Sequence, residues 1–178
     1  LGDSTWWCGT YDECWRQPRG YGNDWLQILE RNFTEHVGEI GTTMTLEFDQ
    51  RVAMENNYDY GYVDVRSAAT SDTWYAVYTV DNPGFAGTPG MSQDWNSTSP
   101  SGPGHMTLDL SDYAGTDLAI RFRFESDGAW SDQDGLWNTD GAVILDNLTV
   151  TLENSGQVDF EDFEYNAGEG GENPGDTQ

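Results

Sequence analysis

The residues with the clearest potential for chemistry lie in one acidic segment interrupted by glycines. Carboxylate oxygens are the ligands that calcium prefers in proteins, so this segment predicts a calcium site. The Asp132-x-Asp134-Gly135 motif is not an EF-hand, because the twelve-residue frame and the final Glu are missing. The alternative is a solvated turn whose Asp side chains accept hydrogen bonds from nearby backbone N–H groups. The candidate ligands are Asp127, Asp132, Asp134, Asp140 and Asp146.

Two predicted strands hold the acidic segment in place. Apolar residues alternate with polar or charged ones over 118–125 and again over 148–152, a period of two that is typical of strands with one buried face. We expect the rest of the chain to pack against these two strands. Residues 1–24 and 81–105 read as loops, because glycine and proline interrupt every period. Further strands are predicted at 25–34, 43–52, 58–67, 74–80 and 106–110.

Recurring strands without a convincing amphipathic helix predict an all-β sandwich. Several segments also carry a family resemblance: WWCG and GYGNDWLQ within 6–27, YDYGYVDV at 58–65, and most of 108–150. These segments resemble the jelly-roll, MAM-like accessory domains of secreted immune inhibitor A type bacterial metallopeptidases. The resemblance implies a two-sheet antiparallel jelly-roll sandwich, often with bound calcium, and no catalytic centre of its own. The sequence holds no His-Glu-x-x-His motif, so the peptidase part of such proteins is absent.

The C-terminal segment departs from this pattern. In the domains that it resembles, an FEDFE segment opens the jelly roll, whereas here FEDFE occupies 160–164, near the end of the chain. We therefore expect a sandwich domain over 1–156, followed by a strand and a glycine-rich tail over 157–178. That strand either begins a next domain, completes its own sandwich as in a circular permutation, or is donated to a neighbouring subunit. The expected assembly residues are Val158, Phe160, Phe163 and Tyr165.

Composition limits the partners. The net charge is −25, from 32 acidic residues against seven arginines and no lysine. Such a chain repels nucleic acid and anionic membranes, and no apolar run reaches the roughly 18 residues that cross a bilayer. The acidity fits a secreted or cell-surface protein among divalent cations, although it also serves solubility alone. In that setting we expect a local disulfide between Cys8 and Cys14.

The inventory of residues does not favour an enzyme. Neither cysteine is placed as a nucleophile, the two histidines have no evident Ser or Asp partner, and no two acids are marked as a catalytic pair. We expect a structural or adhesive building block that self-associates into filaments or joins neighbouring domains.

The alternative is a carbohydrate-binding module of a secreted hydrolase, whose loop tryptophans stack on sugars. The competing interpretation of these rings is that they supply buried area at one end of the sandwich. The candidate stacking residues are Trp6, Trp7, Trp15, Trp95, Trp130 and Trp137. Candidate glycosylation sites are Asn32, Asn96 and Asn147.

Overall fold

The computed structural model describes residues 6–15, 19–33, 42–55, 57–67, 73–80, 104–114, 118–136, 139, 141–153 and 156–161. Strands dominate these residues, and one short 3-10 helix, η2 (Ser111–Tyr113), follows the eighth strand. The strands are β1 (Trp6–Cys8), β2 (Thr10–Tyr11), β3 (Arg19–Gly20), β4 (Leu26–Phe33), β5 (Met44–Val52), β6 (Tyr60–Ser67), β7 (Tyr75–Val80), β8 (His105–Asp109), β9 (Leu118–Glu125), β10 (Val143–Leu152) and β11 (Gly156–Glu161).

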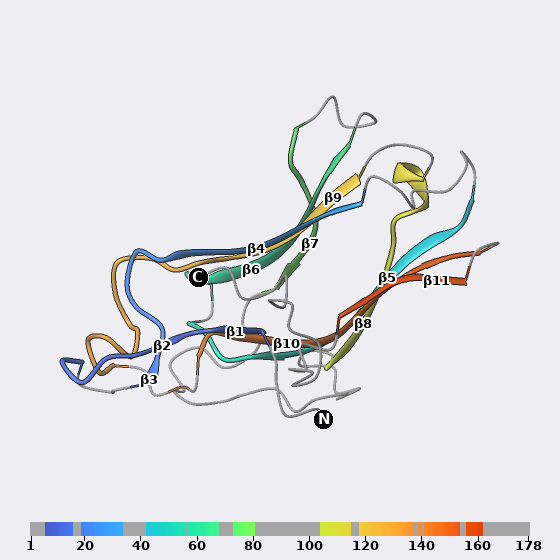
Figure 1. Cartoon of the computed structure of the whole chain (residues 1–178). Helices are drawn as coiled ribbons and strands as arrows, with labels where there is room; N and C mark the ends of the chain where they lie inside the picture. Colours follow the sequence, from blue (N-terminus) through green and yellow to red (C-terminus); the bar gives the residue numbers. More distant parts are fainter. Residues whose placement is uncertain are drawn as a thin grey trace.

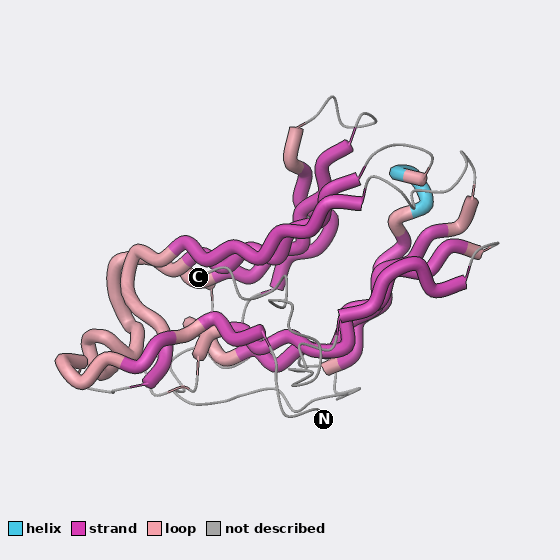
Figure 2. Tube along the Cα trace, viewed as in Figure 1, coloured by secondary structure: helices cyan, strands magenta, loops and turns pink. Residues whose placement is uncertain are grey.

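Two antiparallel sheets lie one above the other in Figure 1, and Figure 2 shows the same two layers as tubes. One sheet has the order β1-β10-β5-β8, and the other has the order β4-β9-β6-β7. The hydrogen-bonded pairs are nested: β6 with β7, then β5 with β8, β4 with β9, and β1 with β10. A long hairpin rolled up in this way is a jelly roll. The predicted all-β jelly-roll sandwich is confirmed.

The core forms because the predicted alternation places large apolar side chains between the two sheets. On β9, Leu118, Ile120, Phe122 and Phe124 are each at most 6% exposed. Phe48 of β5 crosses the sandwich to meet Phe122 edge to face, with 5.0 Å between the ring centroids. Burying each such side chain stabilises the fold by about 1.5–3 kcal/mol.

The two strands that flank the acidic segment occupy inner positions, one in each sheet. β9 lies between β4 and β6, and β10 lies between β5 and the two strands β1 and β11. β10 is longer than the sequence predicted, because it begins at Val143 rather than near 148. Its register against β5 shifts between Asp146 and Thr149, and Asn147 takes a positive φ of 54° there. This bulge interrupts the period of two, which is why the first half of the strand was missed.

The N-terminal residues are not the irregular loop that the sequence predicted. β1 pairs with β10, so that Trp6 lies opposite Leu145 and Cys8 opposite Val143. A strand of three residues is too short to show a period, and the edge of β10 supplies its hydrogen bonds. The two-stranded sheet of β2 and β3 is likewise too short to be read from a pattern.

β11 pairs with β10 of the same chain, along the edge that β1 also uses. Its register runs from Gly156 opposite Leu152 to Glu161 opposite Leu148, with an irregularity beside Val150. Of the predicted assembly residues, Val158 and Phe160 lie in this strand. Phe163 and Tyr165 lie outside the described residues.

The predicted disulfide is wrong, because both cysteines are free thiols. Cys8 is fully buried at the end of β1, and burial holds the pKa of its thiol far above the ordinary value. Cys14 instead lies in an exposed turn, where its backbone N–H donates to Asp12 Oδ1 over 2.8 Å. A spacing of five residues does not show which way each side chain points, and here one faces the core and the other faces solvent.

Candidate metal centre

Three connections meet at one end of the sandwich, those from β3 to β4, from β5 to β6 and from β9 to β10, together with the end of β1. Backbone hydrogen bonds tie them together. Asp24 donates to the Asp127 carbonyl over 2.6 Å, and Ala53 donates to the Ala142 carbonyl over 2.9 Å. Ala142 in turn donates to the Cys8 carbonyl over 2.9 Å. Segments that are far apart in the sequence are therefore held side by side at this end.

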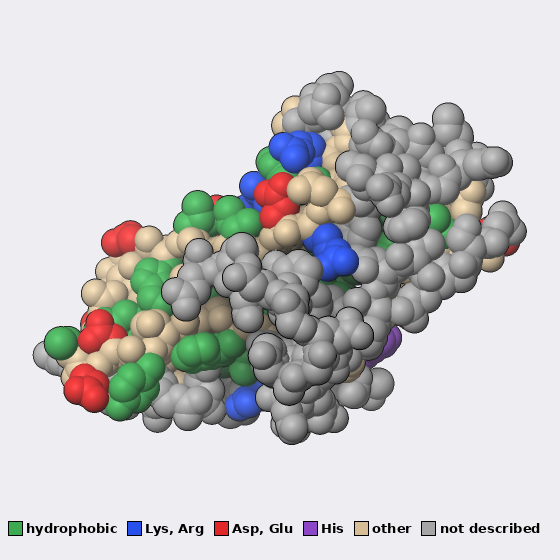
Figure 3. Space-filling model, viewed as in Figure 1, with side chains coloured by type: hydrophobic (Ala, Val, Ile, Leu, Met, Phe, Trp, Pro, Cys, Tyr) green, Lys and Arg blue, Asp and Glu red, His purple; other side chains and the backbone are tan. Residues whose placement is uncertain are grey.

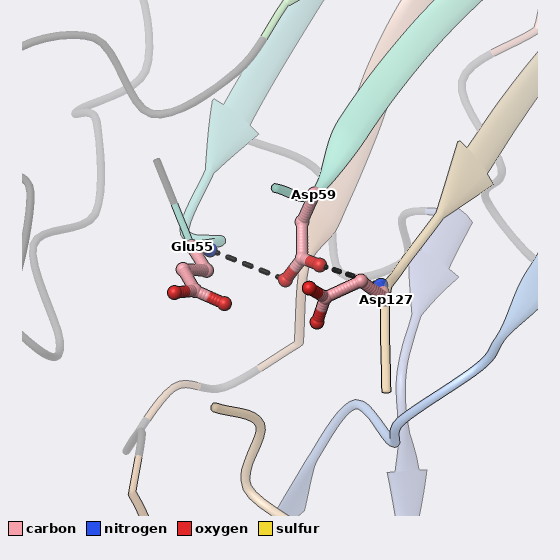
Figure 4. Close-up of side chains that lie close together, drawn as sticks. All are labelled: Glu55, Asp59 and Asp127. Atoms are coloured by element: carbon pink, nitrogen blue, oxygen red, sulfur yellow. Dashed lines mark hydrogen bonds between the residues drawn. The ribbon is translucent and has the colours of Figure 1, made fainter. Parts of the chain in front are cut away.

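Three carboxylates from two of these connections form a cluster, which we call the carboxylate cluster: Glu55, Asp59 and Asp127. One oxygen from each lies within 4.8 Å of the other two. Figure 4 shows the Asp59 and Asp127 side chains close together, with Glu55 on the other side of Asp59. Oxygens that bind one calcium ion at about 2.4 Å lie at most about 4.8 Å apart. The spacing of the three groups therefore suits a shared cation.

Asp59 is the fixed point of the cluster, with a relative exposure of 0%. Its Oδ2 accepts a hydrogen bond from the Tyr21 hydroxyl over 2.6 Å and one from the Glu55 N–H over 3.3 Å. Its Oδ1 accepts from the Asp127 N–H over 3.0 Å. Tyr21 is itself buried and packs edge to face on Phe124. The core strands thus set the position of Asp59, and Asp59 joins the connection after β5 to the one after β9.

The cluster carries negative charge, and no described residue supplies a counter-charge to it. Burial raises the pKa of Asp59 above its ordinary value. Burial, and then repulsion by Asp59, Asp127 and Asp134, raises the pKa of Glu55 to about 7. Within the described part of the chain, no arginine or histidine forms an ion pair with any member of the cluster. A bound cation would remove this electrostatic cost.

Asp134 lies near the cluster, and Asn23 lies beside Asp134. Asp134 is close enough for its charge to raise the pKa of Glu55, and its Oδ2 lies 3.5 Å from Asn23 Nδ2. Asn23 Oδ1 is shielded from solvent and accepts no hydrogen bond from any residue that the structure describes. Amide oxygens as well as carboxylates bind calcium, which takes six to eight oxygen ligands.

The four predicted ligands that the structure describes do not come together as one set. Asp127 belongs to the carboxylate cluster, and Asp134 lies beside it. Asp134 also accepts hydrogen bonds from the backbone N–H groups of Trp130 and Leu136, over 2.8 and 2.9 Å. Asp146 lies in β10, where it accepts from the Asn147 N–H. Asp140 lies outside the described residues.

Asp132 is buried and has a structural role. It accepts hydrogen bonds from the Tyr21 N–H over 3.0 Å and from the Thr139 N–H over 2.6 Å. The Thr139 hydroxyl adds a third bond of 2.8 Å. Asp132 and Asp134 thus both accept hydrogen bonds from backbone N–H groups. This is the role that the alternative interpretation of the acidic segment expected for its aspartates.

The sequence interpretation missed Glu55 and Asp59. Glu55 lies between the predicted strands 43–52 and 58–67, and Asp59 is the second residue of the latter, so neither belongs to the acidic segment from which the site was predicted. The order of the strands, had it been known, would have predicted that these two residues lie near Asp127. Because β5 and β9 run to the same end of the sandwich, the connections that follow them must meet there.

The candidate sugar-stacking tryptophans differ in their surroundings. Trp6 packs against the core. The Trp7 ring packs directly on Gly141, because a Cβ atom added to that glycine would lie only 2.1 Å from Trp7 Nε1. Trp15 is tilted by 54° to Trp25, so these two rings do not form one plane. Trp130 is 42% exposed. Trp95 and Trp137 lie outside the described residues.

The candidate glycosylation sites also differ. Asn32 is exposed in the edge strand β4. Asn147 donates through Nδ2 to Asp49 Oδ2 over 2.8 Å, and a glycan on that nitrogen would disturb this contact. Asn96 lies outside the described residues.

No protein-family model matches the chain, and a comparison with curated proteins finds no match either. Among the residues that the structure describes, none forms a helix with the length and apolar character needed to span a membrane.

Proposed function

We propose that this chain is a non-catalytic structural or adhesive building block, secreted or on the cell surface, in which a divalent cation fixes one end of a jelly-roll sandwich. The observation that carries the proposal is the carboxylate cluster, which combines a spacing suited to one ion with a raised pKa at Glu55 and no ion pair to any described arginine or histidine. Calcium is the first choice, because the three groups at the site are carboxylates.

A cation at the cluster would join two connections. Glu55 and Asp59 follow β5, whereas Asp127 follows β9 of the opposite sheet. An ion bound by all three carboxylates would hold the two sheets together at this end. Binding to the folded chain alone stabilises it by about 2.7 kcal/mol when the ion is at 100 times its dissociation constant.

The expected affinity supports an extracellular setting. Asp59 already accepts three hydrogen bonds, so the site offers few oxygens that are free of other partners. Extracellular calcium-binding modules with few protein ligands have dissociation constants of about 10⁻⁴ to 10⁻³ M. Calcium outside cells would therefore keep the sandwich closed. Since β11 pairs within its own chain, this function does not require strand donation between chains.

The test is thermal unfolding of the protein after dialysis against a chelator, followed by titration with calcium or magnesium chloride. We expect a saturable rise in Tm with calcium and a smaller rise with magnesium, which keeps its water ligands more strongly. Glu55→Gln should abolish most of this rise. The matched control is Glu153→Gln, because Glu153 is exposed and lies beyond the end of β10, outside the cluster. A Tm that does not respond to calcium, with no heat of binding by calorimetry, would refute the proposal.

A further inference from the structure

The outer surface of the sheet β4-β9-β6-β7 differs in composition from the rest of this acidic chain. Side chains on strands β6 and β9, with one residue before β7, form what we call the arginine face. The register sets Arg123 opposite Tyr62 and Arg121 opposite Asp64. The side chains that form the face are Tyr62, Asp64, Arg66, Trp74, Arg121 and Arg123.

Asp64 holds two guanidinium groups in place. It is 1% exposed, and its Oδ2 accepts hydrogen bonds from Arg121 Nε over 2.8 Å and from Arg123 Nε over 2.7 Å. Its Oδ1 accepts a third bond from Arg123 Nη2 over 3.2 Å. A charged pair of this kind fixes the planes of the guanidinium groups. Their donors therefore need little further ordering when a ligand binds.

Aromatic rings alternate with these guanidinium groups across the face. Arg123 lies over the Tyr62 ring at 3.8 Å from its centroid. Arg121 and Arg66 lie over the Trp74 ring at 4.3 and 4.8 Å. Tyr62 and Arg66 are four residues apart on β6, a span of about 13 Å. The face thus offers a row of flat, half-buried rings and fixed hydrogen-bond donors.

The face is electrically balanced, unlike the chain as a whole. Arg66, Arg121 and Arg123 are paired with Glu30, Asp64 and Glu125. Figure 3 shows arginine, acidic and hydrophobic atoms next to one another over this upper sheet. The net charge of −25 repels polyanions, so the binding of an acidic ligand to this face is disfavoured. An uncharged ligand pays no such cost.

We propose that the arginine face binds a neutral polysaccharide chain. Sugar rings present apolar faces that stack on aromatic rings and hydroxyl groups that both donate and accept hydrogen bonds. The guanidinium groups supply donors, and the carboxylates of Glu30 and Glu125, with side chains 36% and 46% exposed, supply acceptors. Two exposed apolar side chains at the edge of the same sheet, Leu26 and Ile28, extend the contact area. This function goes beyond a structural role and does not depend on the metal centre.

The test is affinity electrophoresis of the full chain in gels that contain a soluble neutral polysaccharide: a β-glucan, a mannan, a galactan or a xylan. Polygalacturonate serves as the anionic comparator. We expect at least one neutral polymer to retard the protein and polygalacturonate to leave it unretarded. Calorimetry with an oligosaccharide of the retarding polymer then gives the dissociation constant.

Three variants assign the binding to a surface. Trp74→Ala should weaken binding by roughly tenfold or more, as expected for a central aromatic contact, and Arg66→Ala should weaken it by less. Trp130→Ala is the matched control, because Trp130 is an exposed tryptophan in the connection after β9. Equal Tm values show that the variants fold. Retardation by no neutral polymer, or binding that Trp130→Ala abolishes and Trp74→Ala leaves intact, would overturn the proposal. Concentration-dependent self-association that Trp74→Ala abolishes would also overturn it, since a second copy would then occupy the face.

Discussion

Two buried aspartates in this sandwich have opposite surroundings. Asp64 on the arginine face and Asp59 in the carboxylate cluster are 1% and 0% exposed. Hydrogen bonds and attraction from Arg123 and Arg121 outweigh burial at Asp64 and lower its pKa. At Asp59 burial dominates over its hydrogen bonds, and the pKa is raised. Burial alone therefore does not decide the charge of an aspartate; the difference lies in whether the chain supplies a cation.

At the arginine face, side chains of the protein balance the buried charge, whereas at the carboxylate cluster a bound ion would have to do so. The arginine face needs no partner to balance its charges, and its rings and donors are held in place before any ligand arrives. The carboxylate cluster has fixed positions but unbalanced charge.

The largest effect is expected for Asp64→Asn. This substitution leaves the guanidinium groups of Arg121 and Arg123 half-buried without their shared carboxylate. Removing one partner from a buried charge pair costs about 3 kcal/mol or more. Urea unfolding of the two proteins at pH 7 measures the difference in the free energy of unfolding. A loss below about 1 kcal/mol would show that solvent already screens the pair and that the arginine face is less rigid than its geometry indicates.

The two regions should also respond to pH in opposite directions. The pKa of Glu55 rises from its ordinary value of 4.5 to about 7 on folding, so the folded chain binds more protons in this window. In the presence of a chelator, stability should therefore fall as the pH rises from about 4.5 to about 7. The lowered pKa of Asp64 affects stability below that window. Asp64 contributes fully to the free energy of unfolding above its ordinary pKa of 3.8, and this contribution is lost as the pH falls further.

Urea unfolding at a series of pH values measures this profile. Glu55→Gln should flatten the fall between about pH 4.5 and 7 and leave the acid limb unchanged. Calcium should have the same effect on the wild type. A wild-type profile that stays level across the window without calcium would contradict the unbalanced charge of the cluster.

The smallest effect is expected for Arg66→Ala. The side chain of Arg66 is 39% exposed, and it pairs with Glu30 over 3.6 Å while lying over Trp74. An exposed ion pair and an exposed cation–π contact together contribute roughly 1 kcal/mol or less. Arg66→Lys keeps the charge and should retain part of this stability. Urea unfolding in low and high salt separates the ionic part, because salt weakens the pair and leaves the packing on Trp74 in place.

Periodicity predicted the fold well where a strand has one regular apolar face. The alternation in β9 and β5 located both strands and their buried residues, because side chains of a strand point to opposite faces in turn. The same rule failed at the bulge in β10 and in the three-residue β1, where the period is broken or too short.

The candidate sites were harder to predict than the strands. Asp127 was expected as a ligand, but its partners Glu55 and Asp59 come from a connection about 70 residues earlier, and only the nested pairing of strands brings them together. The same pairing places Arg121 and Arg123 beside Asp64. Local patterns predict which face a residue occupies, whereas they do not predict its neighbours on the next strand.

The inner positions of β9 and β10 have a consequence for the order of folding during synthesis. β1, β4 and β5 emerge early from the ribosome, but they pair with strands that lie at 105–152. Among the described strands, only the pairs β2–β3, β6–β7 and β10–β11 join segments that are close together in the chain. Folds dominated by such distant pairings form slowly, in milliseconds to seconds. Strands β1, β4 and β5 therefore remain without their full set of partner strands until residues 105–152 have been synthesised.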